Sequence, residues 1–199
     1  MRQLLLLAGL ALLLSGCQSF TAQQPPIDPR QAAKNHAQHL ARLDKWQALG
    51  KIKISVDDEP HSASFDWQQF SDNYTINFFG PFGYGSSWLR RTSKGVTLES
   101  PDRAIQWAPT PEQLLQQTVG WQAPIQELQY WIKGQPAPHA ILDDVTLTPE
   151  GAYSQLSQQG WHIQLSRHQN YDNLWLPHKL VASRQGLSVL IIVKQWEPK

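Results

Sequence analysis

Apolar and polar side chains alternate with a period of two along much of the chain. This period places every second side chain on the same face of a β-strand. Turn residues such as Ser93, Lys94 and Gly95 separate the alternating segments. The pattern therefore predicts an antiparallel meander with one apolar face and one polar face. The expected strands are residues 50–56, 62–67, 74–79, 86–91, 96–100, 104–108, 152–158, 160–167, 179–184 and 187–196.

The last of these strands is apolar on both faces. Val189, Ile191 and Val193 share one face, and Leu190 and Ile192 lie on the other. We therefore expect its outer face to be packed as well.

Three segments instead repeat apolar residues at helical spacing. The first is residues 30–46, an amphipathic helix. The second follows residues 110–113, where Thr-Pro-Glu-Gln combines a capping box with proline at the first helical position, and it ends at Gly120. The third follows Pro124 and is closed by Gly134. A strongly curved sheet with helices across its apolar face would form a container closed by a lid.

The N-terminus has the pattern of an export signal. Arg2 precedes an apolar run over residues 4–14, which is too short to span a bilayer that needs roughly 17–25 residues. The sequence Leu-Ser-Gly-Cys at residues 14–17 resembles a bacterial lipobox, in which cleavage precedes a lipidated cysteine. An ordinary secretory signal is the alternative, but Cys17 is the single cysteine of the chain and has no disulfide partner. Gln18 is typical of the outer membrane, because lipoproteins of this kind that stay in the inner membrane carry Asp there.

These features divide the chain into a signal peptide at residues 1–16, a lipid-anchored tether at 17–29 and one domain at 30–199. The tether is polar and rich in proline, which favours flexibility. Because the signal contributes one basic residue, Arg2, the remaining chain has 16 basic and 16 acidic residues. This balance argues against a nucleic-acid partner. The nine tryptophans supply large rigid apolar surfaces, suited to a core or to the walls of a cavity.

Candidate catalytic and metal-binding residues are sparse. Known nucleophile, metalloprotease and phosphate-loop motifs are missing from the sequence. His36 and His39 could place two imidazoles on one helical face, but without a third ligand nearby we expect a solvated helix surface. The aspartate pairs at 57–58 and 143–144 are expected in turns. We therefore expect neither an enzyme nor a protein with a metal or other cofactor.

The connection between two expected strands at residues 80–85 has an unusual composition. Pro81 and the glycines on both sides of Phe82 favour a tight, protruding turn. Phe82 either folds back onto the sheet or forms an exposed apolar wedge that inserts into a bilayer or a partner. The sequence leaves both alternatives open.

Several of these motifs, in this order, resemble the LolB family of outer-membrane lipoprotein receptors. The resemblance spans nearly all of the chain after the signal. Gly80 and Phe82 depart from it, since Asn and Leu are common at those positions, yet phenylalanine is at least as apolar. The motifs are Pro-Ile-x-x-Leu-x-x-Trp-Ile-x-Gly-x-Pro at 124–136, Gly-Pro-Phe-Gly at 80–83, Trp-Gln-Gln at 67–69, Leu-Pro at 176–177 and the apolar strand ending at Trp196.

The resemblance implies a half-barrel of antiparallel strands with a three-helix lid over an apolar cavity. It implies a lipid-anchored monomer of the outer membrane, facing the periplasm, that binds the acyl chains of lipoproteins. Such receptors accept their cargo from the periplasmic carrier LolA and insert it into the membrane without a cofactor. By the same resemblance, Pro81, Phe82 and Gly83 form a membrane-insertion loop.

The inward positions of the expected strands and helices are our candidates for lining the cavity. Periodicity does not separate a cavity wall from an ordinary closed core, so both interpretations remain for each position. Two other functions also remain: an assembly lipoprotein whose concave sheet binds a peptide, and a lipoprotein that binds another lipid. The candidates are Phe65, Trp67, Tyr74, Ile76, Phe78, Leu89, Leu115, Leu128, Trp131, Val189, Ile191 and Val193.

Overall fold

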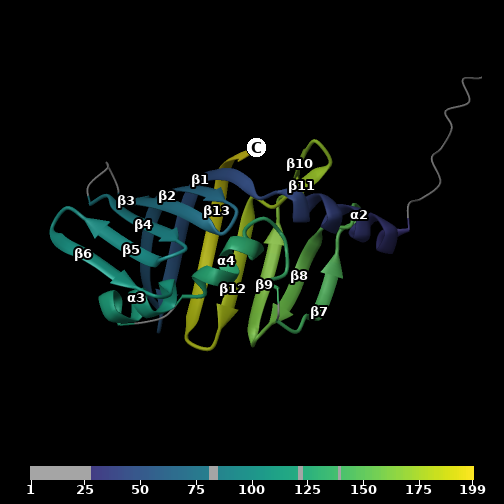
Figure 1. Cartoon of the computed structure of the whole chain (residues 1–199). Helices are drawn as coiled ribbons and strands as arrows, with labels where there is room; N and C mark the ends of the chain where they lie inside the picture. The colour runs from purple at the N-terminus through teal and green to yellow at the C-terminus, as the bar shows by residue number, and fades with distance from the viewer. Residues whose placement is uncertain (1–27, 81–84, 121–122, 139) are drawn as a thin grey trace, which may run out of the picture.

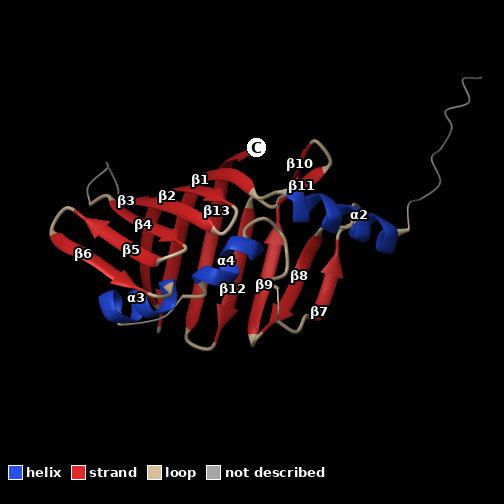
Figure 2. Cartoon of the chain, viewed as in Figure 1, coloured by secondary structure: helices blue, strands red, loops and turns tan. Residues whose placement is uncertain are grey.

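The computed structural model describes residues 28–80, 85–120, 123–138 and 140–199. Antiparallel strands make up most of this part of the chain, with three helices (Figure 2). The helices are α2 (Pro29–Arg42), α3 (Pro111–Val119) and α4 (Ile125–Trp131). The strands are β1 (Lys45–Val56), β2 (Glu59–Phe70), β3 (Asn73–Phe79), β4 (Ser87–Thr92), β5 (Gly95–Ser100), β6 (Arg103–Ala108), β7 (Asp143–Leu147), β8 (Tyr153–Gln158), β9 (Trp161–Ser166), β10 (Gln169–Tyr171), β11 (Leu174–Leu176), β12 (Lys179–Arg184) and β13 (Leu187–Pro198).

Eleven strands form one open antiparallel sheet in the order β6-β5-β4-β3-β2-β1-β13-β12-β9-β8-β7. The long strands β1 and β13 pair at its centre, so the first and last strands of the sequence lie side by side in the middle of the sheet (Figure 1). A register shift in this pair lies at Gly50, where a Cβ atom would collide with the backbone of β13 and the ring of Phe65. The predicted antiparallel sheet is confirmed. Strands β10 and β11 form a separate hairpin.

The first helix is shorter than the helical spacing of its apolar residues predicts. It begins at Pro29 behind the N-cap Asp28, whose carboxylate accepts a hydrogen bond from the Arg30 backbone at 2.9 Å, and it ends at Arg42 rather than at residue 46. Strand β1 then starts at Lys45 and places Trp46 on its buried face. The prediction was wrong at this end because Leu43 and Trp46 continue the helical spacing of Leu40, whereas Trp46 belongs to the strand that follows.

The two faces of the sheet differ in what lies over them. We call the side that carries Phe65, Trp67, Ile76 and Val189 the covered face, because α3 and α4 pack against it in one apolar cluster. In Figure 1, α4 lies across the middle of the sheet and α3 lies near β5 and β6, which it contacts. We call the opposite side the open face. Among the described residues, no helix is long and apolar enough to cross a membrane.

The capping box expected before α3 is present in part. The Thr110 hydroxyl accepts a hydrogen bond from the Gln113 backbone at 3.2 Å, and Gly120 ends the helix with a left-handed φ of 81°. The neighbouring Glu112 side chain, in the same first turn, binds α4. This local arrangement fixes the position of α4 over the sheet.

Candidate functional site

The twelve candidate residues for a cavity come together on the covered face. Ten of them are buried, and Phe78 and Leu115 are half-buried against the same continuous apolar cluster. Leu128 and Trp131 reach the cluster from α4 and Leu115 reaches it from α3, whereas the other nine come from the sheet. In this structure the helices therefore cover the candidate residues, and an apolar ligand would have to enter between the helices and the sheet.

Aromatic rings from four different strands meet at the centre of this cluster. Trp46 lies between Trp67, at 5.4 Å between ring centroids, and Trp196, at 5.3 Å. Trp67 also contacts Tyr74 at 5.7 Å. Tilted and edge-on pairs at such distances are the favourable geometries for aromatic rings. The four rings form one rigid wall of the apolar cluster.

The set of candidates omitted several residues of the same cluster. Trp46 and Trp196 belong to the central wall, and Trp161 contacts Trp131 at 5.9 Å. The signal for Trp161 was present in the sequence, because Trp161, Ile163 and Leu165 alternate along an expected strand. Our candidates included no residue of β9 or β12, although both strands contribute apolar residues to the covered face.

A carboxylate from α3 holds the start of α4. Both oxygens of Glu112 accept hydrogen bonds from Gln126, one from the backbone nitrogen at 3.1 Å and one from the side-chain amide at 2.6 Å. Pro124 precedes the helix and provides no side-chain cap. A negative charge at this position also stabilises the exposed N–H groups of the helix. The two helices over the sheet are therefore linked to each other.

Two buried glutamines tie α4 and the segment after it to the sheet. Gln69, which is 7 % exposed, accepts a hydrogen bond from the Trp67 indole at 2.9 Å and donates one to the Gln129 side chain of α4 at 3.3 Å. Gln158 accepts from the Trp131 indole at 2.9 Å and from the Ala137 backbone at 2.8 Å. These links were not predicted. In the sequence, Gln69 follows Trp67 by two positions and therefore lies on the same strand face. This spacing was the sign that Gln69 would be buried.

A buried cation lies just after α4. The Lys133 ammonium donates a hydrogen bond to the Leu43 carbonyl at 3.1 Å, at the C-terminal end of α2. Burial lowers the pKa of Lys133 to about 8, and nearby Asp44 opposes this shift. Lys133 therefore links α4 to α2 through one charged hydrogen bond.

The histidine pair of the first helix is divided between two environments. His36 is buried and its Nε2 lies 3.2 Å from both the backbone nitrogen and the carbonyl oxygen of Trp175 in β11, whereas His39 is exposed. The expected solvated surface was wrong for His36, because the β10–β11 hairpin folds onto α2.

A second buried histidine, His178, connects the hairpin to the sheet. Its Nδ1 lies 2.8 Å from the carbonyl oxygen of Val193 in β13, and its Nε2 lies 2.9 Å from the hydroxyl of Tyr171 in β10. In the described residues, no group of three potential ligands could hold a metal.

Acidification should weaken the docking of α2, because burial lowers the pKa of His36 below its usual value of 6.5. Unfolded chains take up the proton near pH 6.5 and the folded protein does so only at lower pH, so stability falls as the pH drops below about 6.5. Urea unfolding at neutral and mildly acidic pH measures this dependence. His36→Gln should reduce it, and His39→Gln on the same helix should leave it unchanged. An unaltered dependence in the His36 variant would contradict this assignment.

The remaining predicted sites have different outcomes. Cys17, Pro81, Phe82 and Gly83 lie outside the described residues. Asp57 and Asp58 form the expected turn, with φ of 47° and 67°. The pair at 143–144 begins the irregular edge strand β7 rather than lying in a turn, although the second residue has a left-handed φ of 46°. The left-handed backbone of Asp144 therefore lies in a bulge within the strand, where the register with β8 shifts.

Comparison with known proteins identifies relatives of the whole chain. The sequence profile described as "Outer membrane lipoprotein LolB" matches residues 44–196. The outer-membrane lipoprotein LolB of Pseudomonas paraeruginosa is 35% identical over 100% of this chain and 98% of the relative. The protein of the same name from Pseudomonas savastanoi pv. phaseolicola is 34% identical over 96% of this chain and 94% of the relative. The aligned part of the chain therefore includes the sheet and the helices.

A solved structure shows the same fold at low sequence identity. A LolA superfamily protein from Nitrosomonas europaea superposes with a TM-score of 0.54, at 7% identity, over 87% of this chain and 94% of that chain. This likeness concerns the fold alone, an antiparallel sheet with helices on one face. Together with the profile match and the full-length relatives, the described fold leads to one assignment. The chain belongs to the LolB family of outer-membrane lipoproteins.

Proposed function

We propose that this protein is anchored in the outer membrane through lipids on Cys17, faces the periplasm and receives acylated lipoproteins there. It accepts them from the carrier LolA on its covered face and inserts them into the membrane. The family assignment supports the receptor role and the location. The observation that carries the acceptance step is the continuous apolar cluster between the sheet and the helices α3 and α4.

The physical basis of acceptance is the burial of acyl chains. Each CH₂ group removed from water contributes about 0.8 kcal/mol, so an acyl chain does not cross an aqueous compartment unprotected. Transfer from a carrier requires only that the receptor bind the chains more tightly than the carrier does. Neither a nucleotide nor a metal is needed for such an exchange.

Opening of the covered face is favoured by the way α4 is attached. The helix has only seven residues. Ile125, Leu128 and Trp131 pack on the apolar cluster, and its polar links come from Glu112, Gln69 and Gln158. The aromatic wall of Trp46, Trp67 and Trp196 belongs to the sheet and does not depend on α4 for its pairwise contacts. Acyl chains can therefore replace the apolar side of α4 against a wall that keeps its shape.

The transfer can be tested in solution. The protein from residue 18 onward contains every described helix and strand, and we expect it to take an acylated lipoprotein from its loaded carrier. Gel filtration of the mixture measures the transfer. The same lipoprotein without acyl chains is the matched control and should remain unbound. Binding of both forms would contradict acyl recognition and favour a peptide-binding assembly protein, and binding of neither by folded protein would overturn the receptor role.

Release into the membrane is the role proposed for the loop at residues 81–83. Phe82→Glu should leave acceptance intact and stop the delivery of cargo to liposomes, because a charged tip does not enter the apolar part of a bilayer. Cofloatation of cargo with liposomes measures delivery. Phe70→Glu is the matched control, since Phe70, the last residue of β2, is an aromatic side chain that is 58 % exposed. Unchanged delivery by the Phe82 variant would mean that the loop is merely a turn.

A further inference from the structure

The open face carries an apolar strip bordered by lysines at the centre of the sheet. Ile192 of β13 lies opposite Lys51 of β1 on one side and opposite Lys179 of β12 on the other. Leu190, two positions away, lies between Lys53 and Val181 in the same way. Leu190 and Ile192 are only half-buried, so this face is not packed as the sequence led us to expect. Contiguous apolar surface rimmed by polar residues is typical of an interaction site.

A groove of about 310 Å³ runs along this strip. Leu190 and Ile192 of β13 form one side. Ser62 and Ser64 of β2 form the other side, which is shallower because their side chains are short. The exposed lysines at residues 51 and 53 extend from the strand between them. Lysine stems are apolar and cover such a surface while the ammonium groups remain in water. The groove is therefore apolar at its base and cationic at its rim.

The lining of the groove contains no acidic residue to balance its positive charge. Asp66, on the same strand face two positions beyond Ser64, accepts hydrogen bonds from the side chains of Gln47 and Gln68 instead. Over the described part of the chain, the one ion pair within 4 Å joins Arg90 and Glu99, on strands β4 and β5. The exposed lysines 51 and 53 can therefore bind an external anion, and the half-buried Lys179, opposite Ile192 on β12, adds a third positive charge beside the groove.

We propose that this groove binds acidic phospholipids and so docks the open face on the surface of the membrane that holds the anchor. Cationic rims over apolar bases complement a phosphate headgroup above its acyl chains. An acidic protein would use the charges but would not require the apolar base. The tether of eleven residues before Pro29 reaches at most about 40 Å, which keeps the domain near that membrane. Docked in this way, the covered face is directed toward the periplasm, from which a carrier arrives.

This inference rests on the membrane anchoring proposed above and not on the receipt of lipoproteins. The full lipidated protein can therefore be tested in vesicles without carrier or cargo, and failure here would leave the receptor role standing. Lipidation occupies Cys17, the single cysteine, so a thiol introduced by Ser62→Cys is labelled uniquely with a polarity-sensitive fluorophore. We expect a blue shift in vesicles containing phosphatidylglycerol, none in phosphatidylcholine alone, and loss of the shift in molar salt, where the Debye length is about 3 Å.

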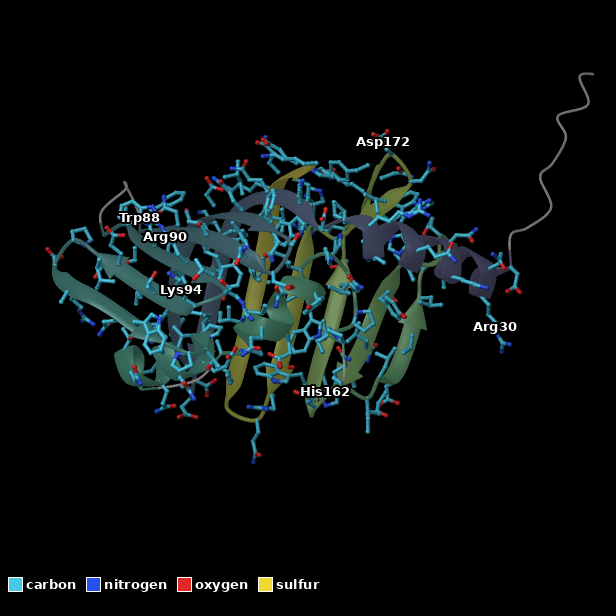
Figure 3. The ribbon with its side chains drawn as sticks, in the orientation of Figure 1. Arg30, Trp88, Arg90, Lys94, His162 and Asp172 are labelled. Atoms are coloured by element: carbon cyan, nitrogen blue, oxygen red, sulfur yellow. The ribbon has the colours of Figure 1, made fainter. Side chains whose placement is uncertain are left out.

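Charge-neutral variants separate specific docking from general attraction. The combined substitutions Lys51→Gln, Lys53→Gln and Lys179→Gln should lower the docking equilibrium about a hundredfold, since each lysine at an anionic surface contributes roughly a factor of five. The matched control replaces three exposed lysines elsewhere, at positions 34, 94 and 199, and should keep the shift. Lys94 lies in the turn after β4, as Figure 3 shows. An equal shift in both vesicle types, or a shift that survives in the groove variant, would overturn the proposal.

Discussion

Trp46→Ala should lower the free energy of unfolding by about 3–5 kcal/mol, the range for removing a large buried aromatic side chain. Trp46 of β1 is 2 % exposed and contacts Trp67 of β2 and Trp196 of β13, so its loss opens a space between the rings of the two strands that flank β1. The surrounding rings are held by their own hydrogen bonds, Trp67 to Gln69 and Trp196 to the Pro177 carbonyl at 3.0 Å. They cannot easily collapse into the space, which places the expected cost toward the upper end.

The measurement is equilibrium unfolding in urea, followed by circular dichroism. Trp107→Ala is the matched control, because Trp107 is 55 % exposed on the edge strand β6 and its removal should cost about 1 kcal/mol or less. Equal losses in the two variants would show that the central aromatic wall does not contribute more to stability than an exposed tryptophan. A small loss at Trp46 with normal folding would instead indicate a site that tolerates empty space, as a cavity wall would.

Strands with clean alternation could be predicted from the sequence, and short or polar ones could not. Phe65, Trp67, Tyr74 and Ile76 follow a period of two and lie on the covered face as expected. The hairpin β10–β11 has only three residues in each strand, too few to establish a period. Strand β7 is exposed along almost its whole length, so it has no apolar face to recognise. Tertiary packing, not local pattern, determines these elements.

The apolar residues of the covered face could be predicted from the sequence, but the hydrogen bonds that hold the helices there could not. Periodicity identifies Leu128 as a buried position on α4, because apolar residues recur along that helix. It gives no partner for Lys133, whose contact with Leu43 joins segments ninety positions apart in the sequence. The same limit explains His36, whose burial depends on a hairpin 139 positions further along the chain. Side chains that bridge distant segments carry no signal in either segment alone.

Gln158→Ala should release the segment after α4 from the sheet and cost about 3 kcal/mol in stability. Gln158 is 1 % exposed and is the last residue of β8. Its amide also donates to the carbonyls of Ala137 at 3.1 Å and Ala140 at 3.3 Å. Alanine at this position leaves these two carbonyls, the Ala137 N–H and the Trp131 indole N–H without their partner. An unsatisfied buried polar group costs about 1–3 kcal/mol, and water entering the space would reduce the total.

Gln155→Ala tests whether the effect comes from the hydrogen bonds of Gln158 and not from the loss of any glutamine in this strand. Gln155 lies on the same strand and is exposed, so its replacement should change stability by about 0.5 kcal/mol or less. Hydrogen exchange of the Ala137 amide provides the local readout, because the Gln158 side chain is its acceptor. We expect this amide to lose protection in the Gln158 variant while amides at the centre of β1 and β13 keep theirs. If the Ala137 amide stays protected, another acceptor must replace the glutamine, and Gln158 would not be the group that holds α4 and its following segment on the covered face.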